Sequence, residues 1–484
     1  MLRIAAFVGS GVLRVLGLAI LFSALVGFYY KENTIGFSLL VLSIIYSIIG
    51  FLGNKYLRPK KQLNITQGFA AVGLSWISLT VAGMLPYLLA LPDIGFVNAL
   101  FETASGFTTT GSSVINDPSA LPKAIQFWRS ITEWIGGMGI IILTISIMPL
   151  LGSGGINLAK AESAGPTPDR LTPRFKDTAL ILWGVYLVFT VTQTLLLTLS
   201  GVDFFSSLNH SFTTISTGGF STFENSVSEF SNISKLIICL FMFIGGASFT
   251  LHYKGRKNFK EYLYSSEFKY FTFIVMFASL ILFIYLYTSG NGLTKSIVES
   301  IFTSLTMITG TGYSSTNFEV WPGGLKIFLL GLMFVGGMAG STTGGIKVVR
   351  LVALLKTVRN ELKKLIFPKA IFKVRMSKSA MTEQSLESVQ TFFILYITVF
   401  GLGSLFLGLT SYFGGTNASI ETILSSVASA LNNIGPALDQ AGPFDTYNFY
   451  DKYSKTLLAF IMLVGRLEMF PIVLLFNKKT WSKA

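Results

Sequence analysis

NALFETASGFTTTG, at residues 98–111, is the first of four stretches that repeat one pattern along this chain. The others are SSLNHSFTTISTGG (206–219), ESIFTSLTMITGTG (299–312) and TILSSVASALNNIG (422–435). Counted back from the final glycine, all four align without gaps over fourteen positions. In each, a moderately apolar segment leads into a polar turn that ends in glycine, and a long apolar segment follows. The repetition predicts four equivalent hairpins.

The composition places these hairpins in a membrane. Of 484 residues, 51% are hydrophobic and only 12% are charged, whereas soluble domains carry about 25% charged residues. The single cysteine, Cys239, excludes disulfides within the chain, and two histidines leave little room for a metal centre. The sequence contains no hydrolase, nucleotide-binding or metalloprotease motif. We therefore expect a polytopic membrane protein that is not an enzyme and uses no organic cofactor.

Ten apolar runs approach the length of about 20 residues that a membrane-spanning helix needs. They lie near 5–28, 35–53, 67–91, 127–150, 178–200, 234–253, 268–288, 325–350, 386–413 and 454–476. The four aligned stretches fall between runs three and four, five and six, seven and eight, and nine and ten. Each stretch is too short and too polar at its end to span the bilayer. Each is therefore predicted to be re-entrant, which means that it returns to the side from which it entered.

The net charge of +14 comes from Lys and Arg residues gathered between the apolar runs. If the hairpins are re-entrant, one face carries the basic segments 54–62, 152–177, 254–269 and 351–385 and the C-terminal tail. The other face then carries the acidic segments 222–233 and 436–453. Basic segments mark the cytoplasmic side of membrane proteins. The charge thus predicts cytoplasmic N- and C-termini, and it indicates membrane topology and no nucleic-acid binding.

The predicted fold is an all-α polytopic membrane protein. Two leading transmembrane helices precede four pseudo-fourfold repeats of helix, re-entrant pore loop and helix around a central pore. The predicted boundaries are 1–62 for the leading helices and 63–177, 178–266, 267–378 and 379–484 for the repeats. The second helix of the third repeat is predicted to be broken.

The polar turns have a composition that suits a dehydrated cation. Transferring a bare ion into low dielectric costs on the order of tens of kcal/mol, and inward-facing backbone carbonyls can replace the lost water. Glycine supplies the φ angles that such a turn needs, while Ser and Thr hydroxyls satisfy neighbouring backbone groups. The C-terminal dipole of each preceding half-helix adds about half a negative charge. Four such ends are expected to converge on the pore.

The second helix of each repeat carries a further shared feature. It contains Gly136-Gly137, Gly245-Gly246 and Gly336-Gly337 in the first three repeats and Gly465-Arg466 in the fourth. With the four turns, these residues resemble the Trk/Ktr/HKT superfamily of potassium transporters. The resemblance covers essentially the whole chain, and the two leading helices are typical of its TrkH branch of bacterial uptake subunits. Members of the superfamily resemble a four-subunit potassium channel fused into one chain.

The resemblance implies that backbone carbonyls of the four turns bind K⁺, the transported ion. The implied ion-facing pairs are Thr110/Gly111, Gly218/Gly219, Thr311/Gly312 and Ile434/Gly435, and the next layer is Thr109, Thr217, Gly310 and Asn433. The fourth turn lacks the threonine of the other three, which predicts an asymmetric filter. The filter loop of potassium channels, TVGYG, contains two glycines. Each turn of this chain has only one aligned glycine, so we expect fewer ion sites and weaker selectivity over sodium.

The eighth apolar run contains five glycines within residues 336–347, and each costs a helix about 1 kcal/mol relative to alanine. One interpretation is close helix packing through small residues. We favour a loop across the pore beneath the filter, which by resemblance is an intramembrane gate. The candidate gate residues are Gly340, Ser341, Thr342, Thr343, Gly344, Gly345 and Lys347, with Arg466 from the tenth run.

Arg466 has two interpretations. A charge at the bilayer centre costs at least about 3 kcal/mol, so the guanidinium is expected to face the water-filled pore, where it opposes cation passage. Alternatively, Arg466 forms a structural ion pair with Glu468 or Glu133. The two roles can coexist.

Other charged or polar residues in the membrane segments have simpler explanations. Glu299 and Glu421 lie near the predicted starts of their half-helices, where the dipole favours a carboxylate. Glu102 lies deeper in its segment and is a candidate partner of Arg129. His210 is expected to be a packing residue.

After Lys347, leucines and valines recur at helical spacing with lysines between them. This pattern predicts an amphipathic helix on the cytoplasmic surface. The helix either anchors the chain to lipid or, as the resemblance implies, docks a cytosolic nucleotide-binding ring protein (TrkA-like). The resemblance also implies a homodimer.

The function expected from these features is potassium uptake across a bacterial inner membrane through a gated, channel-like pore. One alternative is a symporter that couples potassium to protons or sodium, although no titratable acid stands in the aligned turns. A membrane scaffold or enzyme is the other alternative, and no constellation of polar residues outside the pore elements supports it.

Overall fold

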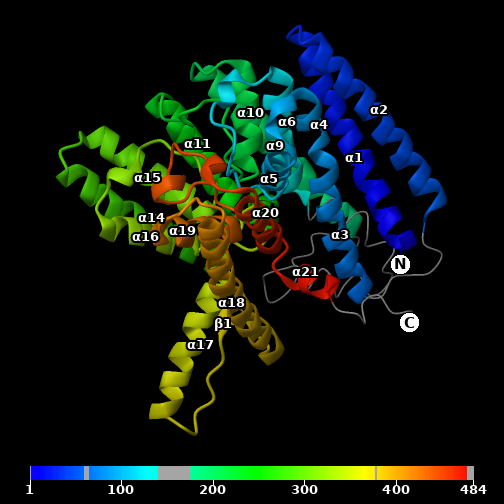
Figure 1. The fold of residues 1–484 in the computed structure, drawn as a ribbon. Helices are drawn as coiled ribbons and strands as arrows, with labels where there is room; N and C mark the ends of the chain where they lie inside the picture. The colour runs from blue at the N-terminus through cyan, green and yellow to red at the C-terminus, as the bar shows by residue number, and fades with distance from the viewer. Residues whose placement is uncertain (1, 59–64, 140–174, 377–378, 477–484) are drawn as a thin grey trace.

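The computed structural model describes residues 2–58, 65–139, 175–376 and 379–476 (Figure 1). The regular secondary structure of these residues is helical, apart from one antiparallel ladder of two-residue strands, β1 (Arg375–Met376) and β2 (Ser379–Ala380). By length and composition, six of the described helices can cross a membrane, and a bent helix pair makes a seventh if it counts as one span. The prediction of an all-α polytopic membrane fold is confirmed.

The two leading helices form an antiparallel hairpin at one side of the molecule (Figure 1). They are α1 (Leu2–Tyr29) and α2 (Asn33–Tyr56). The Ser43 hydroxyl donates to the Gly17 carbonyl at 2.6 Å, and a Cβ added to Gly50 would lie 2.8 Å from the Arg14 nitrogen. Small residues thus let the two backbones approach closely, as is common between helices in membranes.

Each repeat then begins with a long helix and a short pore helix. The long helices are α3 (Ile65–Gly83) with α4 (Leu85–Ala90), α9 (Phe175–Leu199), α14 (Ser266–Thr288) and α18 (Glu383–Phe413). The pore helices are α5 (Phe96–Phe107), α10 (Phe204–Ile215), α15 (Leu293–Thr309) and α19 (Ile420–Asn432). All eight lie where the apolar pattern predicts them. Because α15 begins six residues before Glu299, that carboxylate lies in the second turn and not at the helix start, which corrects the dipole explanation.

The second helices of the second and fourth repeats end before the predicted runs do, and that of the third repeat ends at the predicted break. The four second helices are α6 (Lys123–Gly137), α11 (Asn232–Gly246), α16 (Gly323–Met333) and α20 (Lys452–Arg466). The predicted run 234–253 is wrong as a single helix, because the chain bends by 99° between α11 and α12 (Phe249–Lys257). The run 454–476 is likewise interrupted between α20 and α21 (Phe470–Leu475). The predicted part of the fourth run after residue 139 lies outside the described residues.

The carbonyls freed by the bend after α11 are not left unpaired. The Gly246 carbonyl accepts from the Met338 nitrogen at 2.9 Å, and the Gly245 carbonyl accepts from the Thr342 nitrogen at 3.4 Å. Both donors belong to the irregular segment that follows α16. A helix end buried at membrane depth needs such partners, so the break in the second repeat is matched to the break in the third.

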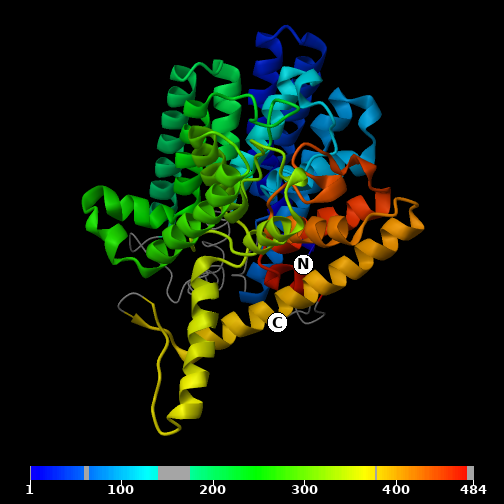
Figure 2. The same ribbon diagram turned by 90° about the vertical axis from the view of Figure 1, so that its left-hand side faces the viewer.

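Helix α17 (Val348–Ile366) projects from the lower end of the molecule in both views (Figures 1 and 2). Its first turns are buried, whereas five apolar side chains farther along are exposed: Leu355, Val358, Leu362, Leu365 and Ile366. The amphipathic helix predicted after Lys347 is therefore present. The remaining short elements are α13 (Lys260–Tyr264) and the 3₁₀ turns η1 (Pro92–Ile94), η2 (Pro118–Ala120), η4 (Phe318–Val320), η5 (Asp439–Ala441) and η6 (Tyr447–Phe449).

Candidate functional site: a ring of four pore loops

The four loops after the pore helices follow one backbone path. The residue two positions before each final glycine has a positive φ, namely 53° at Thr109, 56° at Thr217, 68° at Gly310 and 54° at Asn433. The final glycines also have positive φ angles, of 79°, 86°, 76° and 111° in chain order. A positive φ is an outlier for a β-branched residue and persists only where the surroundings hold it. The alignment read from the sequence is therefore matched in backbone geometry.

The final glycines form a closed ring. A Cβ added to each of the first three would overlap a carbonyl oxygen of the next loop, and a Cβ on the fourth would stand 2.9 Å from a carbonyl oxygen of the first loop. The contacts in chain order are Gly111 with Gly218, Gly219 with Thr311, Gly312 with Ile434, and Gly435 with Thr110. Each partner residue immediately precedes the final glycine of its own loop. The four hairpins therefore surround one axis.

The eight carbonyls predicted to face an ion are brought together by this ring. Seven of them accept no hydrogen bond from the described residues: Thr110, Gly111, Gly218, Gly219, Thr311, Gly312 and Ile434. In the layer beneath, Thr109 Oγ1 and Asn433 Oδ1 are buried without a hydrogen-bond partner among the described residues. Buried polar oxygens normally have a partner. The unpaired oxygens around the axis therefore fit a cation or ordered water.

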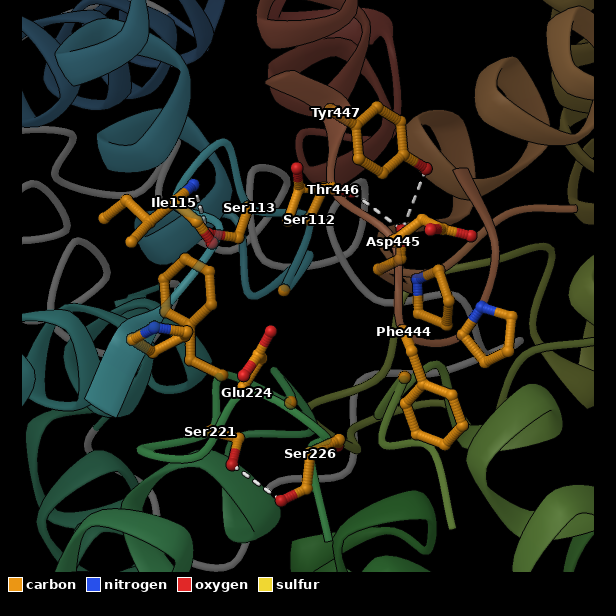
Figure 3. Close-up of a pocket in the computed structure, with 18 of the residues that line it drawn as sticks. Ser112, Ser113, Ile115, Ser221, Glu224, Ser226, Phe444, Asp445, Thr446 and Tyr447 are labelled. Atoms are coloured by element: carbon orange, nitrogen blue, oxygen red, sulfur yellow. Dashed lines mark hydrogen bonds between the residues drawn. The ribbon is translucent and has the colours of Figure 1, made fainter. Parts of the chain in front are cut away.

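A pocket opens onto this ring (Figure 3). It has about 580 Å³ of empty space, counting the open space at its mouth, and all four final glycines line it. Its walls include Ser112 of the first loop, Ser221 of the second and Tyr447 of the fourth, as well as the acidic side chains of Glu224 and Asp445. Partial burial, with the nearby Asp439 charge, raises the pKa of Asp445 above its ordinary value.

In the first, second and fourth repeats the glycines near the end of the second helix pack against the end of a pore helix, whereas Gly336 and Gly337 lie after α16 and approach Gly344 and Gly246. A Cβ on Gly136 would overlap the Phe107 carbonyl oxygen, and one on Gly465 would overlap the Leu431 carbonyl oxygen. Gly137 and Gly246 face the next repeat, because an added Cβ would lie 2.7 Å from the Ser216 Cβ and 2.8 Å from the Thr309 Cγ2, respectively. Any larger residue at these positions would push the pore helices outward. This close approach explains why the pairs recur in the sequence.

The first two loops are held by a buried ion pair. Arg129 of α6 lies 2.8 Å from Glu102 of α5, and both side chains are almost fully buried. The Arg129 guanidinium also donates to the Ser221 carbonyl at 3.0 Å and stacks over the Phe220 ring at 4.2 Å. Glu102 accepts in addition from the Val114 nitrogen at 3.0 Å. The predicted pairing of Glu102 with Arg129 is present, and it joins the first loop to the second.

Glu133, also on α6, supports the second loop and not Arg466. Its two carboxylate oxygens each accept from the Phe220 nitrogen at 3.2 Å, and the carboxylate would overlap a Cβ on Gly218. Glu468 pairs with Arg350. The structural partners proposed for Arg466 are therefore engaged elsewhere.

His210 makes two hydrogen bonds, with the Ser206 carbonyl at 2.8 Å and the Ser221 hydroxyl at 3.1 Å. Both ring nitrogens are thus satisfied within the second hairpin, which agrees with a packing role.

Three lysines tie the second helices of the second, third and fourth repeats to the pore helix of the next repeat around the ring. Each is the fourth residue of its helix: Lys235 in α11, Lys326 in α16 and Lys455 in α20. In the following repeat they contact Glu299 at 2.9 Å, Glu421 at 3.4 Å and Asn98 Oδ1 at 3.0 Å, respectively. Lys326 also pairs with Glu319 of its own repeat at 2.8 Å. The sequence analysis missed these ties, although the shared position of the lysines after each helix start was a signal for them.

The predicted gate residues lie in the irregular segment between α16 and α17, directly against the pore loops. The Thr342 hydroxyl donates to the Ile215 carbonyl at 3.0 Å, and a Cβ on Gly344 would overlap the Asn432 carbonyl oxygen. Gly340, Gly345 and Lys347 have positive φ angles. The break predicted in the eighth run is therefore present, and the segment contacts the C-terminal ends of two pore helices, α10 and α19.

The segment is fixed at its centre and at its end. Ser341 Oγ lies 2.9 Å from Thr343 Oγ1, and the Lys347 ammonium donates to both the carbonyl and the hydroxyl of Thr343. Arg466 Nη1 donates to the Thr342 carbonyl at 2.7 Å, and Arg466 Nη2 donates to the Gly136 carbonyl at 2.9 Å. Arg466 therefore joins the segment to the first repeat across the axis.

Fold and site together define the class of protein: a polytopic membrane protein in which four re-entrant hairpins meet at one axis. The profile of the TrkH family, described as cation transport proteins, matches residues 39–484. The chain belongs to this family, whose members are transporters and not enzymes.

Individual members of the family are similar to this chain over most of its length. The Trk system potassium uptake protein TrkH of Escherichia coli K12 is 34% identical over 436 residues, which cover 88% of each chain. The TrkH protein of Vibrio parahaemolyticus is 39% identical over 355 residues, 71% of this chain and 73% of its own. The crystal structure of the potassium transporter TrkH from Vibrio parahaemolyticus superposes with a TM-score of 0.87 at 33% identity, covering all of both chains. The similarity therefore extends to the whole fold.

Proposed function

We propose that this chain mediates potassium uptake across a bacterial inner membrane through a gated, channel-like pore. In this proposal the ring of four loops is the selectivity filter, and carbonyls of Thr110, Gly218, Thr311 and Ile434 with those of the final glycines replace water around K⁺. The next layer is Thr109, Thr217, Gly310 and Asn433. The single observation that carries the proposal is the closure of the glycine ring, since carbonyls of four loops then point at one axis.

Conduction alone is sufficient for uptake. An interior-negative potential supplies about 2.3 kcal/mol per charge per 100 mV, which corresponds to roughly fiftyfold accumulation. The four pore-helix C-termini add partial negative charge beneath the filter. No coupling ion is required on energetic grounds.

The segment from Gly340 to Gly345, with Lys347 and Arg466, is proposed to be the gate. It packs directly against the ends of α10 and α19, and in this proposal it obstructs the axis. Arg466 holds the segment closed through the Thr342 carbonyl and places a positive charge under the filter. Opening then requires these hydrogen bonds to break.

The surroundings of the pore are proposed on the resemblance and on charge. The four repeats are proposed with the boundaries predicted from the sequence. Both termini are proposed to face the cytoplasm, because re-entrant hairpins would put the basic segments of the sequence on one side. The exposed apolar face of α17 is proposed to dock a cytosolic nucleotide-binding ring protein of the TrkA type, and the chain is proposed to form a homodimer. Mutation of that face tests only the partner and leaves the pore intact.

The filter is tested by placing a side chain in the ring. Gly219→Ser adds a Cβ that would overlap the Thr311 carbonyl, at a φ of 86°. Gly290→Ser is a matched control, because Gly290 has the same φ of 86° and no atom within 4 Å of the added Cβ. In a strain deficient in potassium uptake on low potassium, Gly219→Ser is expected to lose rescue or selectivity, whereas Gly290→Ser rescues growth.

If both variants rescue growth equally at equal expression, the filter assignment fails. Current through single purified molecules distinguishes conduction from coupled symport, because a channel-like pore carries ions far faster than a transport cycle. Potassium flux that moves protons or sodium at a fixed ratio would instead establish the symporter.

A further inference from the structure

The fourth final glycine differs from the other three in what its carbonyl contacts. Three hydroxyl groups donate to the Gly435 carbonyl oxygen: Ser429 Oγ at 2.7 Å, Ser112 Oγ at 2.8 Å and the Tyr447 hydroxyl at 2.9 Å. The carbonyls of Gly111, Gly219 and Gly312 accept none from the described residues. A carbonyl oxygen has two lone pairs. Three donors saturate it.

The backbone of the fourth loop agrees with this difference. Gly435 has a φ of 111°, whereas the φ angles of the other three glycines lie between 76° and 86°. Its ring contact is also looser, since the added Cβ would stand 2.9 Å from the Thr110 carbonyl oxygen, whereas at each of the other three glycines it would stand closer to the carbonyl oxygen of the next loop. Pro436 follows Gly435 and has no backbone N–H. The fourth loop is therefore turned relative to its counterparts.

The three donors come from separate parts of the chain and are rigidly placed. Ser429 lies on α19, directly behind its own loop, and also accepts from the Gly435 nitrogen at 3.1 Å. Ser112 is the residue after Gly111, so it reaches across the seam between the fourth and first loops. Tyr447 lies in η6, and its backbone nitrogen donates to the Ser113 carbonyl at 2.8 Å. The Tyr447 hydroxyl lies at the wall of the pocket above the ring (Figure 3).

We propose that Ser112, Ser429 and Tyr447 withhold the Gly435 carbonyl from the ion, so that the outermost coordination plane of the filter has three carbonyls instead of four. An ion in that plane keeps water on the side of the fourth loop. The three hydroxyl residues are positioning residues, because they act on the ion through the carbonyl. This inference rests on the proposed potassium filter and removes one of its eight proposed carbonyl ligands, that of Gly435.

The first experiment is anomalous diffraction from the full chain soaked in rubidium. The expected map has rubidium on the axis. In the plane of the final glycines, the Gly435 carbonyl lies outside the rubidium coordination shell. One plane lower, the Ile434 carbonyl lies inside the shell. Rubidium coordinated by the Gly435 carbonyl overturns the inference but leaves the filter intact. A map without rubidium anywhere on the axis overturns the filter itself, and the two failures are therefore distinguishable.

The second experiment frees the carbonyl. Ser112→Ala with Tyr447→Phe removes two of the three donors, while the phenyl ring keeps its packing against Phe101. The freed Gly435 carbonyl then becomes an additional ligand for potassium. It is expected to lower the KM for potassium uptake about fivefold, which corresponds to the net contribution of one hydrogen bond.

The matched control is Tyr450→Phe. The Tyr450 ring lies beside Tyr447, but its hydroxyl bonds Ser426 and not Gly435. This variant is expected to keep the wild-type KM. An unchanged or higher KM in the double variant, with wild-type yield and thermal stability, overturns the inference.

Discussion

Both carboxylate oxygens of Glu133 lie 3.2 Å from the backbone nitrogen of Phe220, directly behind Gly218 of the proposed filter. The bond fixes the residue that follows the final glycine of the second loop. A buried acid on the second helix of one repeat thus determines the loop position of the next.

Glu133→Ala is predicted to disturb the second loop specifically. The Phe220 nitrogen loses its acceptor, which costs about 1–3 kcal/mol for a buried unsatisfied group, and the loop is expected to relax toward the space behind it. We expect a several-fold lower K⁺/Na⁺ flux ratio in proteoliposomes. Glu133→Gln keeps an oxygen acceptor and is expected to retain most of the selectivity, and the exposed Glu387→Ala serves as a control. Equal ratios for all of these variants would contradict the role of Glu133.

Arg466→Ala is predicted to raise potassium flux. The guanidinium donates to the Thr342 and Gly136 carbonyls, and its removal frees the segment beneath the filter and deletes a positive charge there. Loss of about 1.4 kcal/mol from the barrier gives roughly a tenfold increase in rate, measurable as flux into potassium-loaded liposomes.

Arg466→Lys separates the two contributions of Arg466. A lysine keeps the charge but lacks the planar fork that reaches two carbonyls at once. A flux close to that of the alanine variant assigns the barrier to the hydrogen bonds, and a flux close to wild type assigns it to the charge. Unchanged flux in both folded variants would rule out Arg466 as part of the gate.

The fold was largely predictable from the sequence because four gapless copies of one pattern are a strong signal. The alignment put Thr109, Thr217, Gly310 and Asn433 at the same position of the repeat, and the structure gives all four a positive φ. The bend after Gly246 was not predictable, since an apolar run reads continuously through Ala247 and Ser248. Its cause is the third repeat, whose Met338 and Thr342 nitrogens capture the freed carbonyls.

The partners of side chains were harder to predict from the sequence than the path of the backbone. Glu102 and Arg129 were paired correctly because they lie in adjacent elements of one repeat. Glu133 was assigned to Arg466 as one alternative, yet its partner is a backbone nitrogen that has no sequence signature. Tyr447 lies in an irregular loop without periodicity, so nothing in the sequence pointed to its contact with Gly435.

Asp445 is predicted to give potassium entry a pH dependence. Burial and Asp439 raise the pKa of its carboxyl group, so protonation occurs at a higher pH than for an ordinary aspartate. As pH falls through that raised pKa, the mouth of the pocket loses negative charge, and flux at low ionic strength is expected to fall. Asp445→Asn is expected to have low flux on both sides of this window and no transition within it.

The control for Asp445 uses charge position and salt. Glu229 does not line the pocket that opens onto the ring. Glu229→Gln is therefore expected to keep the wild-type pH profile. At about 1 M salt the Debye length falls to about 3 Å, so the effect of Asp445 is expected to disappear. A wild-type profile in Asp445→Asn would exclude this residue as the titrating group.

Lys235 and Lys326 occupy the same position in successive repeats but are predicted to differ in importance. Lys235 and Glu299 are only 7% and 5% exposed, whereas Lys326 is 18% exposed and its partners Glu319 and Glu421 are 17% and 44% exposed. Removing one partner of a buried pair leaves an uncompensated charge and costs about 3–5 kcal/mol, while an exposed pair contributes at most about 1 kcal/mol. Lys235→Ala is therefore expected to lower the thermal unfolding temperature strongly and Lys326→Ala slightly.

The double variant Lys235→Met with Glu299→Met completes this test, because it removes both charges and keeps the volume. Replacing a whole buried pair with apolar residues is often neutral, so its unfolding temperature is expected to return toward wild type. If the double variant is as unstable as Lys235→Ala, the cost arises from the lost tie between repeats and not from the stranded Glu299 charge. Potassium flux in the recovered double variant then shows whether the tie also positions the third loop, whose Ser315 hydroxyl donates to Glu299.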